Sequence, residues 1–310
     1  MINQPHHPRV QATDAVMAEA QDFDVIVIVD WSANATPKRG ADSIWSYELE
    51  TGGGPQREPV NHRTRVDARD HLLQVLQRHE HRSVLLGCDF PFGYPAGFAQ
   101  DAGLLRPGLA PWAATWAHLT DRLIDDARNR NNRWEVAAEL NERLGHHRFW
   151  GSPPARAGEH LPTHRPIPAA ADRAAEVRFR SLGKRPFSLW QLLGAGSVGS
   201  QSLTGIPVLH HLRHHRALAG RTRVWPFETG LHAPAPHPGG QIVMAEVWPS
   251  AVGFDHVEHV VKDARQVVAL AHALADDQRA GRLQRAFQPA LPADTASAVV
   301  AEEGWMLGLG

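Results

Sequence analysis

The sequence has little of several features that define particular classes of protein. Its single cysteine among 310 residues, Cys88, excludes an internal disulfide. No apolar run approaches the roughly 18 residues of a transmembrane helix. The first residues, MINQPHHPRV, lack the apolar stretch of a secretory signal. We therefore expect a cytoplasmic protein with no membrane partner.

The sequence also has almost no net charge. It carries 32 Lys and Arg residues against 33 Asp and Glu residues, which gives a formal charge of −1. Such a chain has no global positive field to attract a nucleic acid, so small nucleotides are slightly favoured over long polymers. Five basic residues of the middle region are candidates for phosphate contacts, or else form a solvated surface: Arg133, Arg178, Arg180, Lys184 and Arg185.

The apolar pattern predicts an α/β fold. Continuous apolar runs at 24–33 (DVIVIVDWSA) and 83–89 (SVLLGCD) are typical of central strands buried on both faces. Further strands are expected at 43–49, 59–66, 222–227 and 241–247, and helices from Asp67 and over 263–279. Together these elements predict a mixed β-sheet flanked by helices.

The remaining segments predict the domain organisation. Residues 1–22 are polar and are expected to form a flexible N-terminal arm. Residues 23–310 then form a single domain, with an inserted subdomain of helices and loops at about 105–220. Within the insertion, helices are predicted over 111–128 and 131–144.

Three acidic residues end, or nearly end, predicted strands: Asp30, Asp89 and Glu246. Strand ends of an α/β sheet meet at one edge, where ligands usually bind, and Asp263 begins the helix that follows. Crowded carboxylates repel one another unless a cation neutralises them, and carboxylate oxygens suit Mg²⁺ or Mn²⁺. The alternative is structural, since Asp263 could cap its helix and Asp89 could form a turn.

Five motifs resemble, in this order, the predicted RNase H-like nuclease family: DVIVIVDWSA, LLGCDFPFGYP, AEVWPSA, KDARQVVALAHAL and AEEGWMLG. The similarity spans roughly residues 24–310. It implies an RNase H-like fold with metal-binding catalytic acids at Asp30, Asp89, Glu246 and Asp263. The region 110–220 is not part of a minimal RNase H-like core, which is compatible with an unusual substrate.

The segment GAGSVG at 194–199 predicts a phosphate-binding turn, because backbone N–H groups at a helix start can hold a phosphate. We expect substrate contacts from Gly196, Ser197 and Gln201, with plain tight packing as the alternative. The same segment is one substitution from the G-x-S-x-G motif, which makes Ser197 a candidate nucleophile of a serine hydrolase.

Aromatic residues near the acids are expected either to stack on nucleotide bases or to fill the layer beneath the site. The expected substrate-binding residues here are Trp31, Ser32, Phe92, Tyr94 and Trp248.

Together these patterns predict an Mg²⁺- or Mn²⁺-dependent phosphodiester hydrolase that acts on nucleic acid or a nucleotide. The alternatives are a non-catalytic or regulatory nucleotide-binding protein of the same fold and the serine hydrolase. Substrate identity, the number of metal ions and the oligomeric state stay open.

Overall fold

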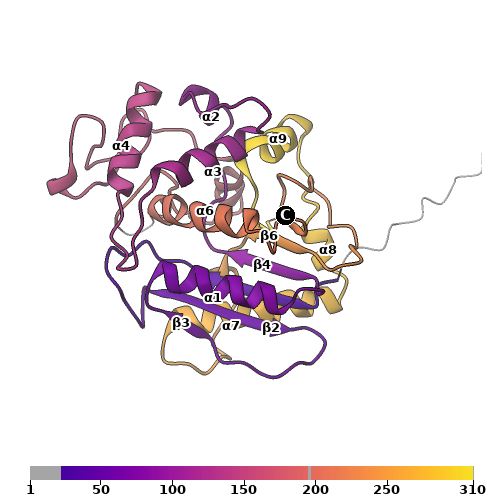
Figure 1. Ribbon diagram of the computed structural model, residues 1–310. Helices are drawn as coiled ribbons and strands as arrows, with labels where there is room; N and C mark the ends of the chain where they lie inside the picture. Colours follow the sequence, from indigo (N-terminus) through magenta and orange to yellow (C-terminus); the bar gives the residue numbers. More distant parts are fainter. Residues whose placement is uncertain (1–21, 195–196, 310) are drawn as a thin grey trace, which may run out of the picture.

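The computed structural model describes residues 22–194 and 197–309, and within them a six-stranded mixed sheet lies at the centre (Figure 1). The strand order is β3-β2-β1-β4-β6-β5. The bounds are β1 Val25–Asp30, β2 Ile44–Glu50, β3 Val60–His62, β4 Val84–Cys88, β5 Thr222–Val224 and β6 Ile242–Glu246. Strands β1, β2 and β3 are antiparallel neighbours, whereas β1, β4, β6 and β5 run parallel. The predicted mixed sheet flanked by helices is confirmed.

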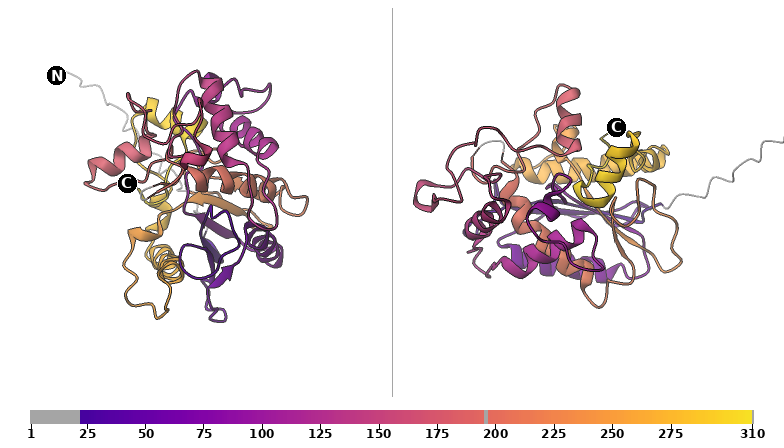
Figure 2. Two further views of the ribbon diagram at one scale, coloured as in Figure 1. Left: turned by 90° about the vertical axis from the view of Figure 1, so that its left-hand side faces the viewer. Right: turned by 90° about the horizontal axis from the view of Figure 1, so that it is seen from above.

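Helices cover both faces of the sheet (Figures 1 and 2). Helices α1 (Arg65–Arg78), α3 (Pro111–Arg122) and α6 (Gly199–His214) contribute to the core on one face, together with Val25, Val27 and Val29 of β1. Helix α7 (Lys262–Arg279) contributes to the core on the other face, together with Ile26 and Ile28. This alternation along β1 is what a strand buried on both faces requires.

Polar side chains set two of the helix ends. The Thr64 side chain accepts a hydrogen bond from the Asp67 N–H at 3.1 Å, so α1 begins two residues before the predicted start. Helix α3 ends at Arg122, before the predicted Arg128. There the Asn132 side chain donates to the Arg122 carbonyl and accepts from the Ile124 N–H, which closes a turn instead of a further helical turn.

The helices of the region between β4 and β5 alternate with long loops. Besides α3 and α6 the region contains α2 (Phe98–Asp101), α4 (Arg133–Leu144), α5 (Ala174–Ser181) and a short 3-10 helix (Pro154–Arg156). Its aromatic side chains Tyr94, Trp116 and Trp190 are buried in the same core as β1 and β4. The inserted residues therefore share the hydrophobic core of the sheet.

The C-terminal residues return to the sheet through α8 (Leu283–Ala286), α9 (Ala293–Ala298) and a π-helical turn (Val299–Glu303). The Leu307 N–H donates to the Glu246 carbonyl at 2.9 Å, and Glu302 and Glu303 accept backbone N–H groups of the loop and helix that follow β4. The chain thus closes over the end of β6.

The N-terminal arm predicted for 1–22 lies outside the described residues except for Asp22. No helix in the described part of the chain is long and apolar enough to cross a membrane.

Candidate functional site

Asp30 and Asp89 lie side by side on one face of the sheet. Val29 pairs with Cys88 in the parallel β1–β4 ladder, so the next residues, Asp30 and Asp89, are neighbours. Both Val29 and Cys88 face the α1 side, and alternation therefore turns the two aspartates toward the α7 side. The Trp31 N–H donates to Asp89 Oδ1 at 2.7 Å and holds this carboxylate in place.

Asp263 joins them from the first turn of α7, the helix that packs on this face. Its Oδ2 accepts the Asp42 N–H at 2.8 Å. The charge of Asp263 acts on both Asp30 and Asp89 and raises the pKa of each. The charges of three of the four predicted acids thus act on one another, although within the described residues their oxygens do not all lie within 4.8 Å.

The three carboxyl groups are held in an environment that disfavours their charge. Burial, then the charges of Asp89 and Asp263, raise the pKa of Asp30 well above its usual range, and its side chain hydrogen-bonds to Asp89. Burial raises the pKa of Asp89 to about 7, although the Trp31 N–H opposes this. Burial also raises the pKa of Asp263. The charge of Lys262 opposes these shifts at Asp30 and Asp263, but among the described residues no Lys, Arg or His nitrogen lies within 4.0 Å of any of the three carboxyl groups.

Glu246 differs from these three acids in having a cationic partner. It pairs with Cys88, one position before Asp89, and lines a cavity together with Asp89. Both of its carboxylate oxygens accept from the Arg173 guanidinium at 2.8 Å. This bidentate partner neutralises Glu246, and its oxygens are already bound.

A cavity of roughly 890 Å³ opens beside the aspartates. Asp30 and Asp263 line one part of it, and Arg133, Trp134 and the start of α6 line another. Asp89 lines a smaller neighbouring cavity with Glu246 and Trp248. The contact between Asp30 and Asp89 therefore lies where the two cavities adjoin.

Four predicted substrate-binding residues line the large cavity: Trp31, Ser32, Ser197 and Gln201. The Ser32 hydroxyl donates to the Asp42 carbonyl at 3.0 Å, and the Gln201 amide donates to the Trp31 carbonyl at 2.7 Å. Gly196 lies outside the described residues. This part of the turn is thus placed beside the acids.

The four aromatic residues divide between buried positions and the cavity walls. Phe92 and Tyr94 are each 1% exposed, and Tyr94 stacks on Phe98 with ring centroids 4.5 Å apart. The Trp31 indole is buried and donates to the Thr204 hydroxyl at 3.2 Å. Trp248 is half-buried, packs edge-on against Phe179 and lines the smaller cavity. Phe92 and Tyr94 therefore line neither cavity, whereas Trp31 lines the large cavity and Trp248 the smaller one.

The Ser197 hydroxyl donates to the Gly194 carbonyl at 2.7 Å. A serine nucleophile needs a hydrogen bond to an adjacent general base. Among the described residues, no histidine or carboxylate hydrogen-bonds to this hydroxyl. The geometry therefore does not favour the serine hydrolase.

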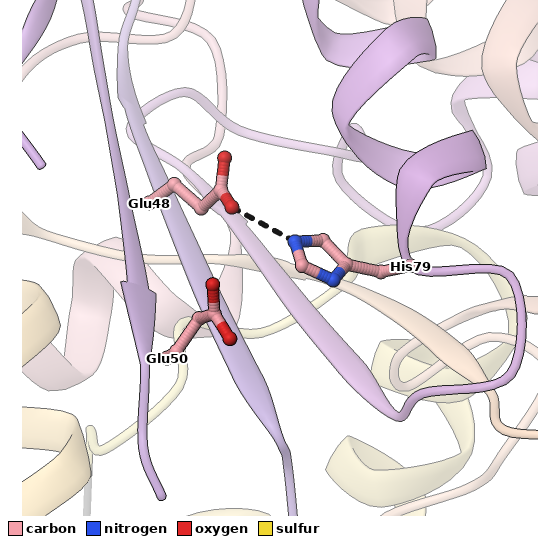
Figure 3. Close-up of side chains that lie close together, drawn as sticks. All are labelled: Glu48, Glu50 and His79. Carbon is pink, nitrogen blue, oxygen red and sulfur yellow. Dashed lines mark hydrogen bonds and ion pairs between the residues drawn. The ribbon is translucent and has the colours of Figure 1, made fainter. Parts of the chain in front are cut away.

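A second acidic cluster, which the sequence patterns did not single out, consists of Glu48, Glu50 and His79 (Figure 3). One potential ligand atom from each lies within 4.8 Å of the others, closer than the three aspartates come together within the described residues. The His79 Nε2 and Glu48 Oε1 atoms are 2.8 Å apart.

Three arginines surround this second cluster and make it a poor metal site. Arg78 bonds to Glu48, Arg82 donates to Glu50 at 2.6 Å, and Arg57 reaches both glutamates at 3.0 and 3.1 Å. The hydrogen bond from Arg82 lowers the pKa of Glu50. A cation would have to displace these partners, whereas the aspartates have none to displace.

No protein family, curated protein or solved structure matches this chain.

Proposed function

We propose that the chain is a metal-dependent phosphodiester hydrolase in which Asp30, Asp89 and Asp263 hold Mg²⁺ or Mn²⁺. The observation that carries this proposal is the contact between the Asp30 and Asp89 carboxyl groups, beside Asp263, without a cationic side chain within 4.0 Å among the described residues. A bound divalent cation removes the repulsion that raises their pKa values.

The three aspartates fit a hard divalent cation better than the other buried acids do. Glu176 and Glu246 share Arg173, while Glu302 and Glu303 accept backbone N–H groups. The aspartates instead offer carboxylate oxygens, the ligands that Mg²⁺ and Mn²⁺ prefer. Asp89 and Asp263 each accept one backbone N–H, which orients a carboxylate while leaving oxygen capacity for an ion.

The proposed chemistry divides between the ion and the side chains. When bound, the cation lowers the pKa of a water molecule and stabilises the leaving oxygen. Asp30 and Asp89 position it at the ends of two adjacent strands, which are rigid elements, and Asp263 approaches from α7. The adjoining cavity, at roughly 890 Å³, has the size of a small-molecule site.

The RNase H-like fold is part of this proposal. It is supported by the positions of the resembling motifs, because DVIVIVDWSA and LLGCDFPFGYP carry the two adjacent aspartates at the ends of β1 and β4. The KDARQVVALAHAL motif forms most of α7 and carries Asp263. The pairing of Glu246 with Arg173 argues for a site of three acids instead of four.

Calorimetric titration with Mn²⁺ tests the metal site. We expect the unaltered chain to bind Mn²⁺ and the D30N variant to lose binding by at least about tenfold, because a carboxylate ligand becomes a neutral amide. The matched control is D276N, which alters an exposed aspartate on α7. Absence of Mn²⁺ binding, or equal binding by D30N, would overturn the site.

Hydrolysis of a chromogenic phosphodiester and of nucleotides tests the reaction. We expect EDTA to stop turnover and added Mg²⁺ or Mn²⁺ to restore it. Turnover that persists in EDTA contradicts the proposal. If Mn²⁺ binds, no substrate is hydrolysed and a nucleotide still raises the melting temperature, the chain is a nucleotide-binding protein instead.

A further inference from the structure

Arg133 is a buried cation in the wall of the large cavity. Arg133 is the first residue of α4 and is 6% exposed. Its Cζ atom lies 4.3 Å from the centroid of the Trp134 ring. The guanidinium Nε donates to the Ser200 hydroxyl at 3.0 Å and Nη1 donates to the Asn131 side-chain oxygen at 2.9 Å. Both acceptors are neutral, so they orient the guanidinium without balancing its charge.

The other two buried arginines have carboxylate partners. Arg65 bonds to both oxygens of Asp125, and Arg173 bonds to Glu176 and Glu246. Arg133 has no carboxylate oxygen within 4.0 Å among the described residues, and its Nη2 has no acceptor there. The charges of Asp125 and Glu135 act on Arg133 without a direct bond, and an anionic ligand would supply the direct partner that is missing.

The first turn of α6 lies beside Arg133. Gly199 donates its N–H to the Gln191 carbonyl, while the N–H groups of Ser200 and Gln201 have no backbone acceptor within the described residues. Ser200 and Gln201 both line the cavity. N–H groups at the start of a sixteen-residue helix that lack a backbone acceptor within the described residues favour an anion, in addition to the guanidinium.

The cavity also contains an apolar wall. Trp134, Leu192, Leu193 and Pro153 are among its lining residues. Its size suits a compact ligand with one anionic end and an apolar or aromatic portion, and a long polymer would not be enclosed.

We propose that Arg133 and the first turn of α6 bind the terminal phosphate of a nucleotide-sized phosphate ester. This inference rests on the proposed function, since it names the substrate class of the same cavity. Arg133 acts here as a binding residue, and the fork of its guanidinium suits a phosphate oxygen pair.

Titration with a nucleoside 5′-monophosphate and with inorganic phosphate, both in EDTA, tests the site without the metal. We expect the nucleotide to bind more tightly than inorganic phosphate. The R133Q variant should bind the nucleotide at least about tenfold more weakly, because a charged hydrogen-bond donor is lost. The matched control is R143Q, an exposed arginine on α4, which should bind as the unaltered chain does.

A second pair of variants keeps the test decisive if R133Q does not fold. Ser197 lines the cavity and is half-buried. S197D adds a negative charge and should weaken nucleotide binding by about tenfold or more. S197N introduces a side chain of the same size as aspartate but without the charge, and it should weaken nucleotide binding much less. Equal binding by S197D and S197N, or by folded R133Q and the unaltered chain, would overturn the proposal.

The two proposals fail differently. Nucleotide binding in EDTA without Mn²⁺ binding leaves this phosphate site standing and removes the hydrolase. Mn²⁺ binding without nucleotide binding leaves the metal site standing and removes the phosphate site. Inorganic phosphate that binds as tightly as the nucleotide would overturn the substrate class.

Discussion

The contact between Asp30 and Asp89 lowers the stability of the chain whenever both carboxyl groups are charged and no cation is bound. In the unfolded chain an aspartate has a pKa of about 3.9. In the folded chain burial raises the pKa of Asp89 to about 7 and that of Asp30 well above its usual range. The folded state therefore binds more protons between these pKa values, so stability must fall as pH rises.

We expect this pH dependence to separate the unaltered chain from the D89N variant. In EDTA, we expect the stability of D89N to gain on that of the unaltered chain as pH rises from about 4 to about 7. The reason is that only the unaltered chain has to ionise both members of the Asp30–Asp89 pair in the folded state. Urea unfolding at pH 5 and pH 8 measures the difference. A constant difference across these pH values would contradict the electrostatic account.

In the second acidic cluster, loss of a carboxylate is not expected to affect Mn²⁺ binding. Glu50 is neutralised by Arg57 and Arg82, so E50Q should leave Mn²⁺ affinity unchanged. Calorimetric titration beside D30N checks this. A loss of Mn²⁺ binding in E50Q that equals the loss in D30N would move the metal site to the cluster of Figure 3.

At the scale of elements, Arg173 joins α5 to β6. This fully buried side chain bonds to Glu176 on its own helix and to Glu246 at the end of β6. Because one guanidinium balances two buried carboxylates, its removal leaves both without a counter-charge. The ion pair therefore determines how α5 is placed on the sheet.

We expect R173M to lower the free energy of unfolding by about 3–5 kcal/mol, the usual cost of removing one partner of a buried ion pair. Urea unfolding measures it. R180M is the matched control, since Arg180 lies on the same helix and is about half exposed. A decrease in the free energy of unfolding below about 1 kcal/mol, as for a surface ion pair, would show that Arg173 does not fix α5 on the sheet.

Elements were easier to predict from sequence than the register between strands. The apolar runs at 24–33 and 83–89 are unambiguous, and both form central strands with an aspartate at the end. The pairing of Glu246 with Cys88 depends on the register between β4 and β6. No local pattern encodes that register.

Burial and pairing were also hidden from the sequence. The ring stack around Tyr94 and the bidentate partner of Glu246 come from segments distant along the chain. Arg133 was one of five basic candidates, and only the tertiary structure shows that it differs from Arg65 and Arg173 in lacking a carboxylate. Contacts of this kind arise from tertiary packing, which overrides local propensity.

At the scale of the molecule, the C-terminal segment is packed tightly against the loop after β4. A side chain at Gly93 would place its Cβ 2.1 Å from the Glu302 carbonyl oxygen and 2.6 Å from that of Glu303. Both obstacles are backbone atoms, so relief requires the segment itself to move. Gly93 thus permits the close approach between two segments distant in sequence.

We expect G93A to lower the free energy of unfolding by about 1–3 kcal/mol, as overpacking does. Limited proteolysis should also cut the segment around residues 299–309 faster. The matched control is G253A, because a Cβ at Gly253 meets nothing within 4 Å. Equal stability and equal cleavage of G93A and the unaltered chain would contradict this packing account.

The order of strands in the sheet also has a consequence for how the chain folds. The half that contains β1, β2, β3, α1 and β4 comes from one continuous stretch, 25–88, whereas β6 reaches β4 only after residues 89–241 have been arranged. Closing a long loop carries a larger entropy cost, so local pairings form first and distant ones slowly. The part expected to form first then contains Asp30 and ends one residue before Asp89, and the late step adds Arg133 and completes the cavity beside these aspartates.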